Sequence, residues 1–558
     1  MRRALGLTLP LLLFPATTVN AQPDREALVV FLDGVSYERL LRTSDMGSIL
    51  AAGGIGILTT PGGDVPATET RRMITRRLGS RGWRVVPGPV DAKSRLSLNA
   101  TARTLRDEVG RSDAEELMVV VVSLAPSGEM RARGENVTAV VIATGTSREL
   151  LTATGPTSGL VSGTTRRSGV VASVDVPKTV RDFLGLPVSA ELPGSPIRVE
   201  GQSPTDLYER YLEYRRIAVP VGVAVLVFTL LALVAALVFL LSGGGGPELI
   251  RAVALWGVLG VSLQVALLSG SWLPTYEPWV VAISLLAIGI AVSGVALRLG
   301  RGRPVRVPAT IAGIGLGLVV VDALLGWRSL LTPLLGGSAL DGVRFYGLGN
   351  PYAGMVLAGA VLLAALMPPL GGLVLLVGAA LFAGLPFLGA DLGGGVTLFA
   401  VAGLWYGLRS RQSGWWAVGG TVVGGVVGTV LLVVAHRFLP GEPTHVSQAV
   451  EGAGGVSGVL DVFLDRLRLN LEITAATPAI WPALAAIPVA LSLAVSRPGP
   501  FRAPLQRFET WRLGVITLAI GGILGYVLND TYGMASVSFI YLALALVYPA
   551  LAERWTNA

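Results

Sequence analysis

Apolar positions divide the chain into two parts. Between residues 22 and 214, short apolar runs such as MVVVVS (118–123) and VTAVVIAT (137–144) are separated by polar stretches, which is typical of buried strands in an α/β domain. Farther on, the runs become long enough for helices that cross a bilayer, although several have only ~16 residues. The pattern predicts an α/β domain at 22–214 followed by an all-α polytopic membrane bundle of about eleven helices at 215–558. The eleven segments lie at about 217–242, 250–269, 278–297, 307–326, 352–367, 369–388, 394–408, 414–436, 479–495, 513–529 and 533–551.

The first residues have the pattern of a targeting segment. Arg2 and Arg3 precede an apolar stretch, and the small-residue sequence VNA ends at Ala21. This order is typical of a secretory signal peptide. We therefore predict a cleaved signal peptide at 1–21 and export of the domain that follows. A retained N-terminal anchor is the alternative interpretation.

Loop charges favour the same orientation. If the α/β domain is exported, the loops predicted on the inner side contain twelve arginines and three acidic residues. The predicted outer loops have more acidic than basic residues. Because an excess of arginine marks the cytoplasmic side of a membrane protein, we predict a plasma-membrane protein with an extracytoplasmic N-terminal domain and a cytoplasmic C-terminus.

Composition excludes several classes of protein and site. Hydrophobic residues make up 52% of the chain and charged residues 14%, a balance that soluble globular proteins do not have. The chain has no cysteine, so disulfides and thiolate metal sites are excluded. The segment 22–214 contains 23 basic and 23 acidic side chains, which argues against a nucleic-acid partner.

Candidate chemistry in the α/β domain lies at strand ends. The sequence LVVFLDG places Asp33 after the first buried strand, and a glycine-rich stretch carries Thr59 and Thr60. Carboxylates and hydroxyls at the carboxyl ends of strands are typical of sites in α/β sheets. Further oxygen ligands for a divalent metal would come from Asp64, Asp91 and Asp175, although Asp175 is more simply a helix N-cap.

A later segment, 160–197, contributes the motifs GTTRRSG, VDVPKTVRDFLGLPV and GSPI. Together with FLDG at the first strand, these motifs resemble the alkaline phosphatase–sulfatase superfamily over most of residues 27–198. The resemblance implies an alkaline-phosphatase-like sheet flanked by helices. It also implies that Asp33 corresponds to a metal-binding aspartate.

The same resemblance implies ligands that this domain lacks. Active members of the superfamily hold two divalent cations with aspartates and histidines, but residues 22–214 contain no histidine. One carboxylate does not hold a dinuclear catalytic centre. We therefore expect a non-catalytic domain in which Asp33 is a vestigial metal residue and no cofactor is needed. In the alternative, an active enzyme, a divalent metal binds Asp33 and either Thr59 or Thr60 is the nucleophile.

Polar residues of the helical part gather on its predicted outer side. Polar groups inside a membrane are costly, so they mark functional positions. A helix expected at 458–472 has one apolar and one charged stripe, and we predict that it lies on the membrane surface or caps the bundle. We also predict an outward-facing polar pocket for an anionic group. Its residues are Asp322, Arg344, Tyr346, Asn350, Asp391, His445, Arg468, Asn529 and Asp530.

The helical part resembles an uncharacterised bacterial multi-pass membrane family through RFYGLGN, GADLGGG and LND. This resemblance implies the bacterial plasma (inner) membrane. In the favoured hypothesis, the protein binds or transports an anionic lipid or a lipid-linked cell-envelope precursor. The alternatives are a metal-dependent phosphotransferase or phosphodiesterase acting on a lipid-linked substrate, and a scaffold that organises partners. The pattern leaves the oligomeric state open.

Overall fold

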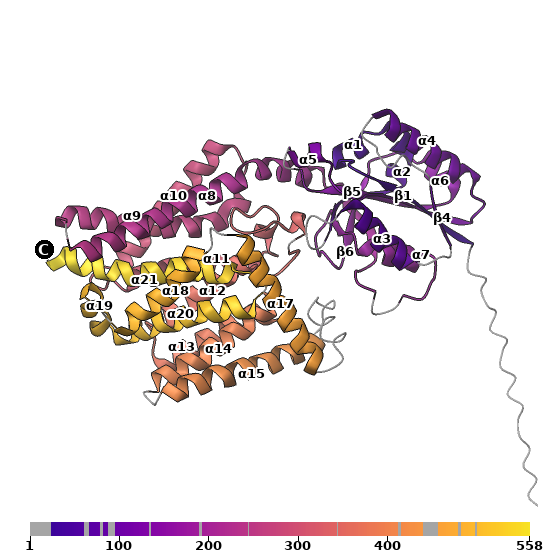
Figure 1. Ribbon diagram of the computed structural model, residues 1–558. Helices are drawn as coiled ribbons and strands as arrows, with labels where there is room; N and C mark the ends of the chain where they lie inside the picture. Colours follow the sequence, from indigo (N-terminus) through magenta and orange to yellow (C-terminus); the bar gives the residue numbers. More distant parts are fainter. Residues whose placement is uncertain are drawn as a thin grey trace, which may run out of the picture.

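The protein consists of a mixed α/β domain and a helical part (Figure 1). The computed structural model describes residues 24–60, 66–78, 82–86, 95–132, 135–188, 192–243, 245–342, 344–410, 414–438, 456–477, 481–496, 499–529 and 531–557. The predicted signal peptide at 1–21 lies outside the described residues, as do Asp64, Asp91, His445 and Asp530.

The α/β domain is built on one eight-stranded sheet with the strand order β3-β1-β4-β5-β2-β6-β8, in which β7 also pairs with β2. β5 and β8 run antiparallel to their neighbours, and the other pairs are parallel. The predicted mixed α/β architecture is therefore confirmed. The strands are β1 (Arg25–Leu32), β2 (Gly53–Thr59), β3 (Trp83–Val85), β4 (Glu116–Ser123), β5 (Thr138–Gly145), β6 (Ser158–Ser162), β7 (Val170–Ala172) and β8 (Ile197–Gln202).

Helices cover both faces of this sheet because successive strand residues point to opposite sides. Leu28 and Val30 of β1 pack in one apolar cluster, whereas Val29 and Phe31 pack in another. The first cluster includes residues of α1 (Tyr37–Leu41), α2 (Gly47–Ala52), α4 (Arg95–Arg111) and α6 (Ser147–Thr152). The second includes residues of α3 (Ala67–Leu78) and α7 (Asp175–Phe183). The two groups lie on opposite sides of the sheet (Figure 1). The short α5 spans Gly128–Ala132.

A single helix, α8 (Thr205–Ser242), joins the two parts (Figure 1). Its first turns bury Tyr208, Tyr211 and Tyr214 in the same apolar cluster that lies under α4. That cluster continues to Leu263 and Leu267 of the helical part. The α/β domain and the first helices after it therefore share one apolar core.

The helical part contains one helix within each of the eleven apolar segments expected from the sequence. Among the described residues, seven helices are long and apolar enough to cross a membrane, namely α8, α9 extended by η2, α10, α11, α15, α20 and α21. This finding is consistent with a membrane protein, and a count of eleven crossings stays a prediction. The helices after α8 are α9 (Pro247–Ala266), α10 (Pro278–Leu299), α11 (Arg306–Leu324), α12 (Asn350–Ala364), α13 (Pro369–Gly384), α14 (Leu392–Arg409), α15 (Gly414–Phe438), α17 (Val456–Ala476), α18 (Trp481–Ser496), α19 (Arg502–Arg507), α20 (Glu509–Leu528) and α21 (Gly533–Asn557).

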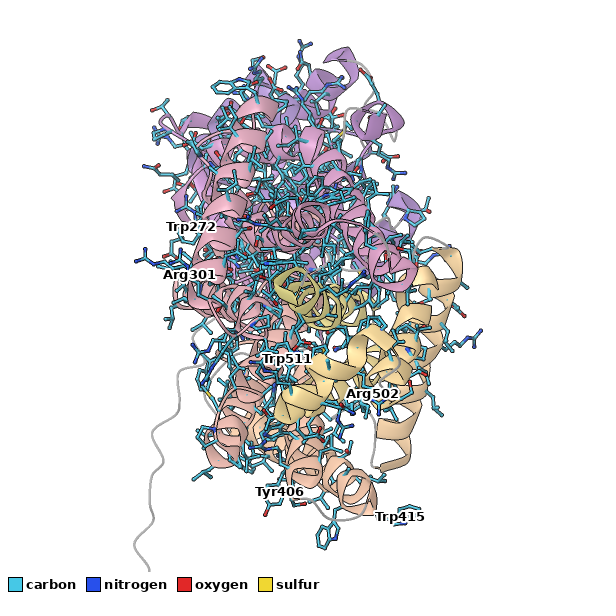
Figure 2. The ribbon with its side chains drawn as sticks, turned by 90° about the vertical axis from the view of Figure 1, so that its left-hand side faces the viewer. Trp272, Arg301, Tyr406, Trp415, Arg502 and Trp511 are labelled. Carbon is cyan, nitrogen blue, oxygen red and sulfur yellow. The ribbon has the colours of Figure 1, made fainter. Side chains whose placement is uncertain are left out.

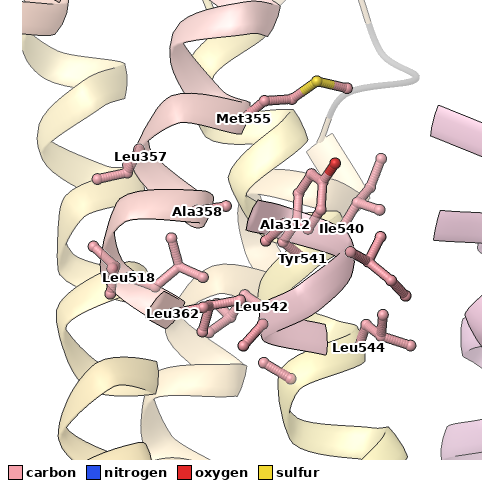
Figure 3. Close-up of a cluster of buried hydrophobic side chains, with 14 of the residues drawn as sticks. Ala312, Met355, Leu357, Ala358, Leu362, Leu518, Ile540, Tyr541, Leu542 and Leu544 are labelled. Atoms are coloured by element: carbon pink, nitrogen blue, oxygen red, sulfur yellow. The ribbon is translucent and has the colours of Figure 1, made fainter. Parts of the chain in front are cut away.

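The centre of the helical part is α12, although it is one of its shorter apolar helices. Thirteen of its 15 residues are buried. Met355, Leu357 and Leu362 of α12 meet Leu518 of α20 and Tyr541 of α21 (Figure 3). Because α12 is surrounded by other helices, its first turn is held firmly at the end of the bundle that faces the α/β domain.

The outer surface of the helical part is apolar. On α15 only three residues are buried, and Trp415 at its start is 80% exposed and stands at the margin of the molecule (Figure 2). Trp272, in η2 (Leu267–Trp272), is also at the margin in this view. Apolar helix faces that no protein covers are typical of helices that contact lipid, so these surfaces fit an interaction with the bilayer.

Candidate functional site

The turn after β1 holds Asp33, the predicted metal residue. The next residue, Gly34, has φ +66°, and a Cβ there would lie 2.9 Å from the Cβ of Ser127. The Gly34 N–H donates to the Ala125 carbonyl at 3.0 Å, and the Ser123 hydroxyl donates to the Val35 carbonyl at 2.7 Å. The Asp-Gly pair is therefore explained by a tight turn within the α/β domain.

Thr59 and Thr60, the predicted nucleophiles, lie at the end of β2. The sheet places β4 and β5 between β1 and β2, and three strand spacings amount to about 14 Å. Thr59 is buried, and its hydroxyl has no hydrogen-bond partner within the described residues. The end of β2 faces Gly342 of the helical part, where a Cβ would lie 2.8 Å from the Thr59 Oγ1. These threonines thus form a contact between the two parts of the protein.

The paired arginines of the GTTRRSG motif lie at the same contact. The Arg167 guanidinium donates to the carbonyls of Gly326 (2.7 Å), Trp327 (2.7 Å) and Phe345 (3.0 Å). Gly326 and Trp327 directly follow the end of α11, so Arg167 holds the loop that leaves this helix. Arg166 stacks on the ring of Tyr346, with the guanidinium carbon 3.9 Å from the ring centre. We call this contact region the junction.

Helix α8 adds further polar contacts to the junction. Asp341, in η4 (Ala339–Asp341), accepts a hydrogen bond from Tyr211 at 2.6 Å and forms an ion pair with Arg215 at 3.1 Å. Arg210 donates to the carbonyls of Ser271 and Leu273, at 2.8 and 2.7 Å. Charge-assisted hydrogen bonds of this length are among the stronger ones in proteins. The helical part is therefore tied to the α/β domain through side chains from both.

Asp322, at the end of α11, is one of the predicted ligand residues. It is buried, and its carboxylate accepts hydrogen bonds from the backbone N–H and the hydroxyl of Ser329, the former at 2.9 Å. Burial lowers the pKa of Arg167, and the nearby Asp322 carboxylate raises it. Asp322 therefore shapes the η3 turn (Arg328–Leu330) and supplies a negative charge close to the Arg167 guanidinium.

Arg344 and Asp391 are brought together at the start of α12 and α14. Asp391 is the N-cap of α14, and its carboxylate accepts from the Gly394 N–H at 3.2 Å. The Arg344 guanidinium lies 4.0 Å from the Asp391 carboxylate, a separation too long for a hydrogen bond. Arg344 also donates to the Leu348 carbonyl at 2.6 Å. One quarter of the Arg344 side chain is exposed, against 4% for Asp391, so the arginine is the accessible member of the pair.

Two predicted asparagines lie beside this pair. The Asn350 amide donates to the Thr531 hydroxyl at 2.5 Å. A Cβ at Gly393, in the first turn of α14, would lie 2.6 Å from the Asn529 side-chain oxygen, which places Asn529 next to Asp391. The Asn529 backbone carbonyl also receives a long hydrogen bond, 3.3 Å, from Asn470 of α17. The first turns of α12 and α14, the end of α20 and one residue of α17 therefore meet at one polar point.

Arg468 and the histidines lie elsewhere. The Arg468 side chain is 80% exposed and pairs with Glu472 one turn farther along α17, so it does not join Arg344. His436, near the end of α15, contacts the Gly384 carbonyl at 2.9 Å. His445 and Asp530 lie outside the described residues. The surface helix expected at 458–472 corresponds to α17.

Strained backbone is concentrated at the same place. Among the described residues, three non-glycine residues have positive φ, namely Arg166 (+53°), Trp327 (+59°) and Ala390 (+47°). Arg166 and Trp327 lie in the junction, and Ala390 lies beside it, because a Cβ at Gly347 would be 3.2 Å from the Ala390 Cβ. Such positions cost of order 1–3 kcal/mol each and cluster at functional sites. The strain therefore marks this region independently of its charges.

A metal site is not apparent in the part of the chain that the structure describes, where no three His, Asp or Glu side chains stand close enough to hold an ion. Asp175, a predicted oxygen ligand, is buried, and its carboxylate accepts from Thr164, Ala172 and Ser195. Burial raises the Asp175 pKa, and these hydrogen bonds oppose the shift. Asp175 is the first residue of α7, whose N-cap is Val174, and its carboxylate binds groups outside this helix. The prediction that Asp175 caps the helix is therefore wrong.

Comparison of the chain with protein-family models, curated proteins and solved structures gives no match. The resemblances found in the motifs therefore stay predictions. Sequence analysis did not select Arg167, Asp341 or Asn470 for the site. Asp341 stands in an Asp-Gly turn, which is a detectable signal, but Arg167 binds backbone carbonyls that no sequence pattern reveals.

Proposed function

We propose that this protein binds an anionic lipid, or a lipid-linked precursor of the cell envelope, where the α/β domain meets the helical part. The observation that carries the proposal is the Arg344–Asp391 pair. Its arginine is accessible, its carboxylate is buried, and the two are 4.0 Å apart. An incoming phosphate would offer Arg344 the short bidentate contacts that Asp391 does not.

In this proposal the α/β domain is an extracytoplasmic, phosphatase-like recognition domain without catalytic activity. Arg166 and Tyr346 stack at the junction, two residues from Arg344 along the chain. The ligand would therefore meet groups from both parts of the protein. In the transport form of the same proposal, binding is followed by movement of the lipid across the membrane.

Recognition is favoured over catalysis by the position of the predicted catalytic groups. Asp33 follows β1 and Thr59 ends β2, and two other strands separate β1 from β2, a distance of about 14 Å. A nucleophile must lie about 3 Å from the atom that it attacks. Thr59 is also buried against Gly342. A metal held at Asp33 would thus be remote from both threonines.

The test is the titration of the full-length protein in phosphatidylcholine nanodiscs with phosphatidylglycerol. Native mass spectrometry counts the bound anionic lipid for wild type, Arg344→Ala and Arg468→Ala. We expect Arg344→Ala to weaken the apparent affinity about tenfold, since a charge-assisted contact is worth about 1.5–3 kcal/mol. Arg468 is a matched control, because the same residue type pairs with Glu472 on an exposed helix face.

Equal affinity of wild type and Arg344→Ala would overturn the proposal. An equal loss in Arg468→Ala would also contradict it, because that result would indicate general surface attraction. Turnover of a phosphoester that disappears on chelation of divalent metal would instead support the enzyme alternative.

A further inference from the structure

A cavity of about 230 Å³ lies between α11, α12 and the two short turns η2 and η3. It stands at the end of the bundle that faces the α/β domain, next to the η3 turn that Asp322 shapes. This cavity is separate from the Arg344–Asp391 pair, because neither of those residues lines it.

The mouth of the cavity is apolar and faces outward. Leu318 and Val321 of α11 and Leu325, the residue after this helix, line it and are 37%, 49% and 55% exposed. Trp272 lines it from η2 and is 41% exposed, at the margin of the molecule (Figure 2). Both elements belong to candidate membrane spans, η2 as the end of the span 247–272 and α11 as a span of its own, so this apolar mouth fits a position that faces lipid.

The inner wall of the cavity is polar at one point. Tyr352 of α12 is 2% exposed and lines the cavity beside Ser329 and Asp322. Its hydroxyl lies beside the Ser329 side chain, whose own hydroxyl donates to Asp322. Tyr352, Ser329 and Asp322 therefore form one polar point on an otherwise apolar wall. The ester, ether or phosphate oxygen of a ligand at this depth would accept a hydrogen bond from the Tyr352 hydroxyl.

The walls at the junction side are held by both parts of the protein. The Ser271 hydroxyl donates to the carbonyls of Ser329 and Thr332, each at 2.9 Å, and so ties η2 to η3. Arg210 holds the Ser271 carbonyl, and Arg167 holds Trp327, the residue before η3. At the rim, the exposed Arg328 lies over the Trp272 ring, 5.2 Å from its centre.

We infer that this cavity binds the hydrocarbon chain of a membrane lipid, which enters sideways from the bilayer between Trp272 and Leu318. Its apolar mouth takes the chain, and the Tyr352 hydroxyl takes the first polar group of the lipid. Arg328 stands at the rim, where a headgroup would leave the cavity, and Trp272 is at a position typical of interfacial tryptophan. The inference deepens the proposed function. Its preference for an anionic headgroup rests on that function, whereas the binding of the hydrocarbon chain does not.

The experiment uses the full-length protein in nanodiscs with a phospholipid that carries a diazirine in the middle of one chain. Two probes are compared, one phosphatidylcholine and one phosphatidylglycerol, and cross-linked peptides are mapped by mass spectrometry. We expect labelling to concentrate at 268–272 and 318–325. Leu318→Trp, which narrows the mouth, should lower this labelling about tenfold, because the lost burial of about two methylenes of the chain corresponds to that factor.

Leu286→Trp is the matched control, because Leu286 lies on the exposed face of α10 and does not line the cavity. Ser269→Leu, from a second wall, repeats the test if Leu318→Trp does not fold. Even labelling along α10 and α11, unchanged by Leu318→Trp and by Ser269→Leu, would overturn the inference while leaving the proposed function to its own titration. Concentrated labelling by both probes, unchanged in Arg344→Ala, would support the chain site even where anionic selectivity fails.

Discussion

Two arginines at the junction differ in how fully their hydrogen bonds are satisfied. Arg167 donates to three carbonyls at 2.7–3.0 Å, which uses donors on all three nitrogens of its guanidinium. Arg344 donates to the Leu348 carbonyl and stands 4.0 Å from Asp391 with part of its side chain exposed. The first arrangement holds two parts of a protein together, whereas the second leaves a cation available to a ligand. A charged side chain alone therefore does not identify a binding site. Whether its donors already have partners in the protein distinguishes a structural arginine from one that can bind a ligand.

The largest effect of a single substitution is expected at Arg167. Arg167→Ala leaves three junction carbonyls without their donor, so we expect the free energy of unfolding to fall by about 2–3 kcal/mol. Hydrogen exchange should rise in residues 325–346, on the helical side of the junction. Thermal unfolding and exchange mass spectrometry measure both effects, with Arg148→Ala, at an exposed position, as the control. Unchanged exchange in that segment would contradict the assigned role of Arg167.

A substitution at Gly342 tests the same junction by steric overlap instead of by loss of a charge. It has φ +74°, and a Cβ there would lie 2.8 Å from Thr59 Oγ1 and closer still to the Thr60 carbonyl oxygen. Gly342→Ala should lower the free energy of unfolding by about 1–3 kcal/mol. Gly336→Ala is the control, because φ is +97° but the nearest atom is an ordinary 3.4 Å away. Equal losses in the two variants would show that backbone strain alone is responsible.

A substitution at Asp391 tests whether Arg344 is available to an anionic ligand. Asn also caps helices well, so Asp391→Asn should change the free energy of unfolding by less than about 0.5 kcal/mol. Removal of the carboxylate leaves Arg344 without its nearby negative charge. The affinity for phosphatidylglycerol in the nanodisc titration should therefore rise a few-fold. A fall in affinity would indicate that Asp391 itself contacts the ligand.

Asp33 is expected to give the smallest effect. In Asp33→Ala the Gly34 turn and its backbone hydrogen bonds remain, so lipid affinity should stay within about twofold of wild type. Metal analysis of the two purified proteins by mass spectrometry is the check. A stoichiometric divalent metal present in wild type and lost in Asp33→Ala would revive the enzyme alternative.

Sequence patterns predicted where helices and strands lie better than they predicted which strands pair with one another. Apolar periodicity is a local property, so the α/β domain and the eleven helical segments could be read from it. The insertion of β4 and β5 between β1 and β2 depends on long-range pairing, and the distance between Asp33 and Thr59 follows from that pairing. No local pattern contains this information.

Sequence patterns predicted some residues of the candidate site and missed others, because they show which residues are polar but not which groups those residues contact. Arg344 and Asp391 were selected because polar residues near membrane helices are unusual, and they do meet. Arg468 was selected by the same criterion, yet it pairs with Glu472 on an exposed face. Asn470 and Arg167 were missed because their partners are backbone carbonyls, which every residue carries.

The uninterrupted course of α8 has a mechanical consequence. The same helix contributes Tyr208 and Tyr211 to the α/β domain core and then runs through the bundle to Ser242. A rotation of the α/β domain about the helix axis must turn α8 as well, and with it the surface that packs on α9. Pro220 lies inside this helix and removes one backbone hydrogen bond, so bending is easiest there. A change in the angle between the two parts is therefore accommodated most easily at Pro220, whereas a rotation about the helix axis is passed on to the contact between α8 and α9.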